Sequence, residues 1–275
     1  MQTIKRIFDF YVFSNIHVAL AVFCLTKITL LEYTIESNLM PWFAFFSTIA
    51  SYNFIRLYKV SEIQYWTSRF VEEHKKGILT ITVLSLGLVI YLSFLLKFST
   101  LLALVPFVFF TVFYVVPIPV KKNNSLALRS VAFLKLFLIA ISWAGVTVLV
   151  PWINYDIEFE LTEMIIFIQR FLFVVAITIP FDIRDMKFDS AHLKTLPQVV
   201  GIAGAKRVGL LFLMVFLGLE FFKNPMDASQ FRIHLMIAVF SLYFLFRATV
   251  DQNKYFSAFF VESLPIVWLL LLFVF

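Results

Sequence analysis

The sequence predicts an all-α integral membrane protein, a single domain over residues 1–275 that folds as a bundle of about nine transmembrane helices. The first observation is composition, because a mean hydropathy of +0.93 with 61% hydrophobic and only 15% charged residues does not describe a soluble domain. The second is that apolar windows of ~20 residues, the length that crosses a bilayer, recur along the whole chain. No segment between them is long enough for a separate soluble domain, so the functional groups must lie in the bundle or its loops.

Each expected span is a run of mostly apolar residues bounded by polar or charged ones. The first group of spans is Phe8–Leu31, Leu39–Leu57, Ile78–Leu96, Leu101–Val116 and Ala127–Val150. After an acidic connection, the second group is Glu163–Ile179, Ala205–Phe222, His234–Thr249 and Phe256–Phe275. The fourth and eighth windows are short for a bilayer, so the count depends most on them.

The basic residues predict how this bundle is oriented. When the N-terminus and the even-numbered connections are assigned to one side, that side collects 17 of the 23 Lys and Arg residues, and the acidic connection falls on the other. By the positive-inside rule we expect a cytoplasmic N-terminus and, with nine spans, a C-terminus outside, in a multi-pass protein of the cell (inner) membrane. The net charge of +6 then reflects topology and anionic lipid headgroups, and no nucleic acid partner is expected.

One of the few densely charged runs of the chain follows the sixth span and reads Pro-Phe-Asp-Ile-Arg-Asp-Met-Lys-Phe-Asp. It places Asp182, Asp185 and Asp189 at i, i+3 and i+7, along one face if the run is helical. Hard oxygen ligands so arranged suit a divalent cation such as Mg²⁺. The alternative is a solvated loop whose acids fall at helical spacing by chance.

Together with nine helices and a following Lys-Thr-Leu-Pro at residues 194–197 and Gly201, this run resembles the second signature of the UbiA superfamily of intramembrane prenyltransferases. In that family, two aspartate-rich motifs after helices 2 and 6 hold Mg²⁺ and, through it, the diphosphate of an isoprenoid donor. The resemblance implies that Asp182, Asp185 and Asp189 are catalytic metal ligands. Residues 114–121, which begin with Tyr114 and end with Lys121, similarly resemble the tyrosine, proline and lysine run that follows helix 4 in the family.

The chain departs from the family at the first motif. The family pattern is Asn-Asp-x-x-Asp-x-x-x-Asp, whereas this chain keeps only Asn53 and has Phe54, Leu57 and Ser61 at the acidic positions. One interpretation is that Arg56 and Lys59 supply positive charge to a diphosphate directly, in place of one metal ion. The other is that both are positive-inside anchors at a site that no longer does chemistry.

The resemblance implies transfer of a prenyl group from an isoprenoid diphosphate to a lipophilic or aromatic acceptor, with Mg²⁺, at the cytoplasmic face. Metal and basic groups would neutralise the departing diphosphate and so favour an allylic carbocation. The candidate diphosphate-binding residues are Asn53, Arg56, Lys59, Tyr114, Lys121, Lys187 and Lys194. The alternative is a catalytically inactive relative that binds an isoprenoid lipid or supports a membrane assembly.

Polar residues elsewhere suggest further features. Residues 58–77 place apolar side chains at helical spacing opposite charged ones, as a helix on the membrane surface would, although a solvated loop fits equally. Within the spans, Lys135 could reach a central anionic headgroup or snorkel to the interface, and Glu262 could pair with it. Asn15 and His17 are expected to be interhelical hydrogen-bond partners.

Overall fold

The computed structural model describes residues 2–58, 65–121, 124–128, 131, 134–223 and 227–275. These residues form a helical bundle with one small β-hairpin, so the all-α prediction holds except at that hairpin, β1 (Ile118–Lys121) and β2 (Asn124–Leu126). The helices are α1 (Gln2–Phe13), α2 (Ile16–Glu32), α3 (Leu39–Tyr58), α4 (Tyr65–Glu73), α5 (Lys75–Ser93), α6 (Phe98–Val115), α7 (Leu134–Ala144), α8 (Val150–Asn154), α9 (Leu161–Asp185), α10 (Leu196–Gly218), α11 (Ala228–Arg247) and α12 (Leu264–Val274). A π-helical turn joins α7 to α8 at Gly145–Leu149, another precedes α12 at Phe256–Val261, and 3₁₀ turns lie at Ala191–Leu193 and Leu219–Phe222.

All nine predicted spans fall on these helices. Within the described part of the chain, seven helices are long and apolar enough to cross a membrane, and α1 with α2, bent by 53°, would be an eighth. The remaining predicted span, Leu39–Leu57, forms α3. This helix is not apolar enough to be counted as a membrane crossing, because its last turns carry Ser51, Tyr52, Asn53 and Arg56. The count of nine membrane crossings therefore stays a prediction.

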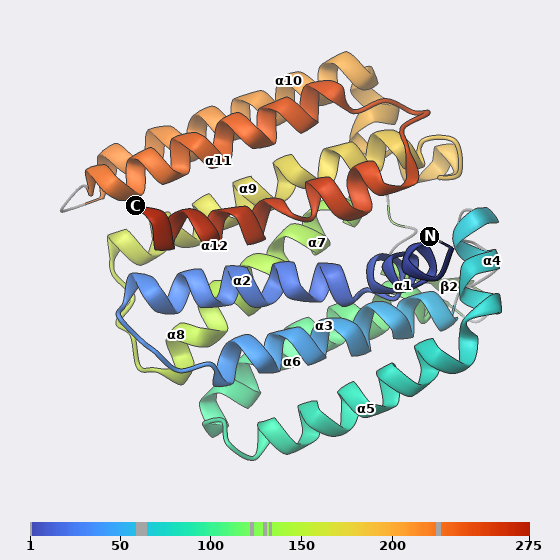
Figure 1. The fold of residues 1–275 in the computed structure, drawn as a ribbon, viewed down its shortest axis with the longest axis horizontal. Coiled ribbons are helices and arrows are strands. Elements are labelled where there is room, and N and C mark those ends of the chain that lie inside the picture. Colours follow the sequence, from blue (N-terminus) through green and yellow to red (C-terminus); the bar gives the residue numbers. More distant parts are fainter. Residues whose placement is uncertain (1, 59–64, 122–123, 129–130, 132–133, 224–226) are drawn as a thin grey trace.

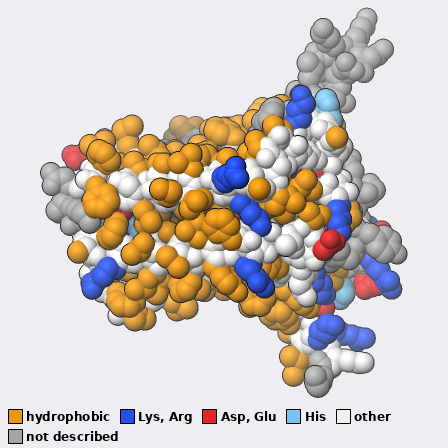
Figure 2. Space-filling view, turned by 90° about the horizontal axis from the view of Figure 1, so that it is seen from above, with side chains coloured by type: hydrophobic (Ala, Val, Ile, Leu, Met, Phe, Trp, Pro, Cys, Tyr) orange, Lys and Arg blue, Asp and Glu red, His pale blue; other side chains and the backbone are white. Residues whose placement is uncertain are grey.

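The two ends of the bundle differ in character. The N-terminus, α4, β2 and the connections α9–α10 and α11–α12 lie at one end, and the C-terminus lies at the other (Figure 1). Hydrophobic side chains cover most of the face in Figure 2, and charged side chains are densest toward its right-hand end. The described part of the segment after α3 forms a helix, α4, rather than a loop, and its place on the membrane surface stays a prediction. Which end faces the cytoplasm stays a prediction.

Helix α9 lies at the centre of the bundle, packed against α7, α10 and α11. Because it is buried on most sides, its one mid-span cation must find partners inside the protein. Arg170, 1% exposed, donates to the carbonyl of Leu25 at 2.7 Å and stands over the Trp268 ring at 5.1 Å. This arrangement fixes α9 against α2 and α12.

The bend between α1 and α2 directs both helices toward α3. Asn15 takes a left-handed conformation with φ 69°, which Asn adopts more readily than most residues. Its Nδ2 donates to Oδ1 of buried Asn53 at 2.6 Å, and His17 Nε2 lies 3.0 Å from the carbonyl oxygen of Phe259. The expectation that Asn15 and His17 bond between helices is thus met, and these contacts hold α1 beside the cationic end of α3.

Candidate functional site

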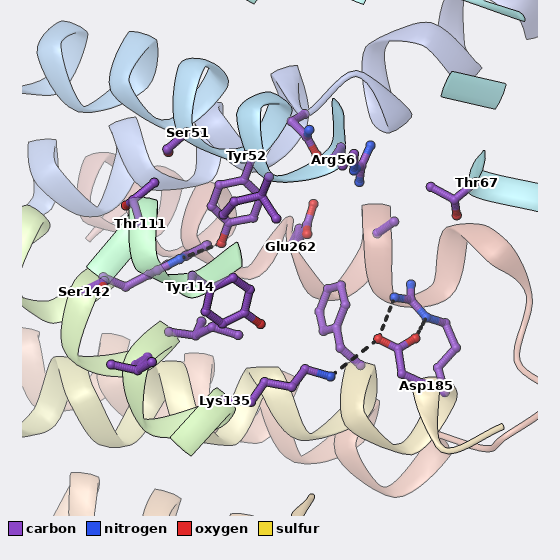
Figure 3. Close-up of a pocket in the computed structure, with 18 of the residues that line it drawn as sticks. Ser51, Tyr52, Arg56, Thr67, Thr111, Tyr114, Lys135, Ser142, Asp185 and Glu262 are labelled. Atoms are coloured by element: carbon purple, nitrogen blue, oxygen red, sulfur yellow. Dashed lines mark hydrogen bonds and ion pairs between the residues drawn. The ribbon is translucent and has the colours of Figure 1, made fainter. Parts of the chain in front are cut away.

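A cavity of about 320 Å³ lies between α3, α6, α7, the end of α9 and the turn before α12. One part of its wall is aromatic, aliphatic and hydroxyl-bearing, with Ser51, Tyr52, Phe110, Thr111, Tyr114, Leu138, Ile139, Ser142 and Trp143. The other part is charged, with Arg56, Lys135, Arg184, Asp185, Asp189 and Glu262. Figure 3 shows Ser51, Thr111 and Ser142 on the left of the cavity and Arg56, Glu262 and Asp185 on the right, where Thr67 of α4 also lies.

The three predicted aspartates converge on one atom. The ammonium Nζ of Lys135, carried by α7, lies 3.0 Å from Asp182, 3.9 Å from Asp185 and 2.7 Å from Asp189. Helix α9 ends at Asp185, and a turn in which the amide of Asp189 donates to the Asp185 carbonyl at 2.8 Å brings the last carboxylate back to the same point. The three carboxylates therefore lie close together, as their spacing predicted, and they surround the ammonium of a lysine.

This geometry does not fit a divalent metal site. Among the described residues, no three carboxylate, histidine or cysteine side chains are arranged so that they could hold a metal ion. The point between the aspartates holds an ammonium, and Phe54 and Leu57 on α3 offer no carboxylate from the facing helix. The metal-ligand role of the aspartates stays a prediction from sequence that the folded residues do not favour.

The segment after the aspartates supports their position. Thr195 caps α10 in a reciprocal capping box with Gln198, and Pro197 stands in the first turn. Gln198 Nε2 also donates to the carbonyl oxygen of Asp189 at 3.0 Å. The Thr-Leu-Pro-Gln sequence therefore starts a helix and holds the aspartate turn in place, and a kink at Gly201, with φ 72°, follows it.

Two arginines face the carboxylates from other directions. Arg184 binds Asp185 through Nε at 2.8 Å and stands 5.1 Å from the centre of the Phe181 ring. Arg56 donates to the backbone carbonyl of Phe13. Glu262 interacts electrostatically with Arg56 and Arg184, which corrects the expectation that it pairs with Lys135.

The predicted diphosphate-binding residues do not all reach this cavity. Arg56 and Tyr114 line it, whereas Asn53 is buried against Asn15. Lys187 is 47% exposed and pairs with Asp251, and Lys194 is exposed in the α9–α10 connection. Lys59 and the side chain of Lys121 lie outside the described residues.

Several lining residues are not among the predicted site residues. Arg184 lies inside the aspartate run and was available from sequence as a charge next to the carboxylates. Tyr52 and Trp143, joined by a hydrogen bond of 2.9 Å from Nε1 to the hydroxyl, carry no signal that distinguishes them from other membrane aromatics. Lys135 was visible as a charge inside a span, but its partners were not.

Comparison with known proteins supports the fold. No protein-family model and no curated protein sequence matches the chain. Among solved structures, the apo structure of a UbiA homolog from Aeropyrum pernix K1 superposes with a TM-score of 0.68 over 94% of this chain and 97% of that one. The sequence identity is 14%, so the likeness shows a shared fold.

Proposed function

We propose that this chain, which has the fold of a UbiA homolog, is a membrane prenyltransferase-like protein that transfers a prenyl group from an isoprenoid diphosphate to a lipophilic or aromatic acceptor. The observation that carries the proposal is the divided wall of the cavity, with charged side chains, three of them cations, at one part and aromatic and aliphatic side chains at the other. An isoprenoid diphosphate has the same division between a polar head and an apolar chain. The volume of about 320 Å³ lies in the range of small-molecule pockets.

Arg56 is the cation best placed to meet the diphosphate. Among the described residues its guanidinium donates to a backbone carbonyl, and the carboxylate that acts on its charge is that of Glu262, which lines the same cavity. A guanidinium has five N–H donors in a fixed fork, so donors remain for phosphate oxygens. Arg184 and Lys135 line the same part of the wall, each already shared with carboxylates.

The chemistry proposed is heterolysis of the allylic carbon–oxygen bond. The cations offset the charge that grows on the leaving diphosphate, which lowers the barrier to departure. Tyr52, Tyr114 and Trp143 line the apolar part of the cavity, where their rings would stabilise an allylic carbocation until the acceptor attacks it. The new bond forms from the electron pair of the acceptor, which then loses a proton to the released diphosphate or to water. Mg²⁺ has no part in this step, because the described aspartates surround an ammonium and do not assemble a site for the metal. A divalent cation that accompanies the diphosphate would enter as part of the substrate.

One observation favours the alternative, an inactive relative that binds an isoprenoid lipid. In the polar part of the cavity wall, the described carboxylates (Asp185, Asp189 and Glu262) equal the cations (Arg56, Lys135 and Arg184) in number, and Asp182 behind them lies against Lys135. The wall therefore offers little net positive charge to an anionic head that arrives without its own cations, whereas a neutral prenyl lipid needs none.

Donor binding and turnover, measured separately on purified protein, decide between these functions. We expect allylic diphosphates of some chain length to bind, to release diphosphate and to prenylate an aromatic acceptor. Each reaction is run both with Mg²⁺ and with EDTA. Arg56→Ala should weaken donor binding by about tenfold or more, because it removes charge-assisted hydrogen bonds. The matched control is Arg69→Ala, whose side chain is 68% exposed on α4 and pairs with Glu73.

Three outcomes are informative. Equal effects of the two substitutions would leave Arg56 as an anchor and contradict its role in binding. Donors that bind across several chain lengths and never turn over would contradict the transferase and support the lipid-binding alternative. If neither a prenyl diphosphate nor a prenyl alcohol binds, both functions fail.

A further inference from the structure

Lys135 occupies a position unlike that of a lysine anchored at a membrane surface. Its side chain is 14% exposed, and the side chains of Asp182, Asp185 and Asp189 are 1%, 21% and 6% exposed. A lysine in a span usually extends its amine toward the headgroups. Here the amine turns into the bundle instead, where three carboxylates surround it.

The carboxylates could accept a metal only if the amine left. Mg²⁺ binds oxygen at 2.0–2.1 Å in near-octahedral geometry, whereas these oxygens stand 2.7–3.9 Å from Nζ, the spacing of ion pairs and hydrogen bonds to an ammonium. A metal ion in the same space would also be repelled by a fixed positive charge a few ångströms away. The arrangement is thus matched to a monovalent cation supplied by the protein.

Helix α3, which lies across the cavity from the aspartates, also lacks the ligands of a metal site. Where the aspartate pattern requires acids on α3, the chain has Phe54 and Leu57, and its only charged side chain in the last turn is Arg56. With no carboxylate on α3, a metal bound to α9 would lack the oxygen ligands that the resemblance implies for the first motif. The absence of acids from α3 and the inward-pointing lysine are two separate observations. Both are explained if the site holds the lysine instead of a metal ion.

We propose that Lys135 is the resident cation of this aspartate cluster and holds the position that the sequence pattern assigns to a divalent metal ion. Asp182, Asp185 and Asp189 are then positioning residues, which keep the ammonium at the cavity wall whatever the metal concentration. Because the amine lines the cavity, its charge is presented to a bound ligand. This inference concerns the protein without substrate, so it does not depend on the identity of the donor proposed above.

Direct metal binding tests the inference. Mn²⁺, a paramagnetic substitute for Mg²⁺, is titrated into purified protein in detergent, and free Mn²⁺ is measured by electron paramagnetic resonance with Mg²⁺ as competitor. We expect no stoichiometric site in the wild-type protein. Lys135→Gln should bind Mn²⁺ at least roughly tenfold more tightly than wild type, because the repelling charge is gone while three carboxylates remain. Lys135→Arg, which keeps a cation, and the control Lys187→Gln, whose lysine pairs with Asp251 away from the cavity, should behave as wild type.

The wild-type titration keeps the test decisive even if Lys135→Gln folds poorly. Stoichiometric Mn²⁺ binding by the wild-type protein that Asp182→Asn or Asp189→Asn removes would overturn the inference. A folded Lys135→Gln protein that still binds no Mn²⁺ would also overturn it, since something other than the lysine would then exclude the metal. No prenyl donor enters the assay, so its result is separate from success or failure of the proposed transferase activity.

Discussion

Replacement of Lys135 by Met should destabilise the protein more than any single change at its partners. Methionine keeps the length of the side chain and removes the ammonium, which leaves Asp182 and Asp189, 1% and 6% exposed, without their cation. Removal of one partner from a buried ion pair costs about 3–5 kcal/mol, because the remaining charge stays out of water. Asp182→Asn alone should cost less, since Lys135 keeps Asp189 at 2.7 Å and the carboxylates repel one another less.

A double-mutant cycle measures the interaction itself. If the lysine and the aspartate act as one unit, Lys135→Met with Asp182→Asn should be less destabilised than the sum of the single changes, with a coupling energy of about 0.5–3 kcal/mol. Unfolding is followed by tryptophan fluorescence as SDS is added to detergent micelles. Lys187→Met is the control, because its exposed pair with Asp251 should contribute only about 0–1 kcal/mol. Additive single effects, or a cost for Lys135→Met no larger than that of the control, would refute the reasoning.

Three further predictions concern packing and buried polar groups and use the same unfolding assay. Gly145→Ala should cost about 1–3 kcal/mol, because an added Cβ would lie 2.0 Å from a ring carbon of Phe107 where the π-helical turn meets α6; no loss would show that the ring moves freely. Glu220→Gln should cost about 1–3 kcal/mol or more, because it leaves buried Lys223 without the carboxylate now 2.8 Å away, and a neutral result would mean that the lysine reaches water. Trp143→Phe should cost about 1 kcal/mol, because the indole hydrogen bond to Tyr52 at the cavity wall is lost. Trp143→Tyr has a ring of similar size to Phe but carries a hydroxyl, so an equal cost for both substitutions would mean that the size of the ring matters and the hydrogen bond does not.

Much of the fold follows from local pattern. The nine apolar windows predicted where the membrane helices lie, because length and hydropathy largely decide which segments can cross a bilayer. Their boundaries were less accurate: the predicted starts Phe8, Ala127, Ala205 and His234 differ from the observed helix starts by six to nine residues, and the bend between α1 and α2 inside the first window was not predicted. The spacing of Asp182, Asp185 and Asp189 likewise predicted that the carboxylates gather, because helical geometry sets which side chains share a face. The hairpin Ile118–Leu126 was missed, since short strands in a connection carry little periodic signal.

The partners of the charged side chains did not follow from pattern. Lys135 and Asp189 are 54 positions apart, and Arg56 meets the carbonyl of Phe13 from 43 positions away, distances over which no local rule operates. Lys187, only two positions from Asp185, turns to Asp251 instead of the cavity. For the same reason Glu262 lies beside Arg56 and Arg184 and not beside Lys135, which the predicted spans placed at a similar depth in the membrane.

The sequence by itself therefore determined the helical membrane bundle, the resemblance of its second aspartate motif to a prenyltransferase family, and the absence of acids from the first motif. All three depend only on composition and on the spacing of residues that are close in the chain. Only the tertiary structure decided which cation the aspartates hold. Helix α7 passes α9 at the depth of Lys135, so the cation that meets the three carboxylates, of which Asp182 is fully buried, is an ammonium from the chain itself. Such a choice depends on how helices far apart in sequence are packed, which no single segment encodes.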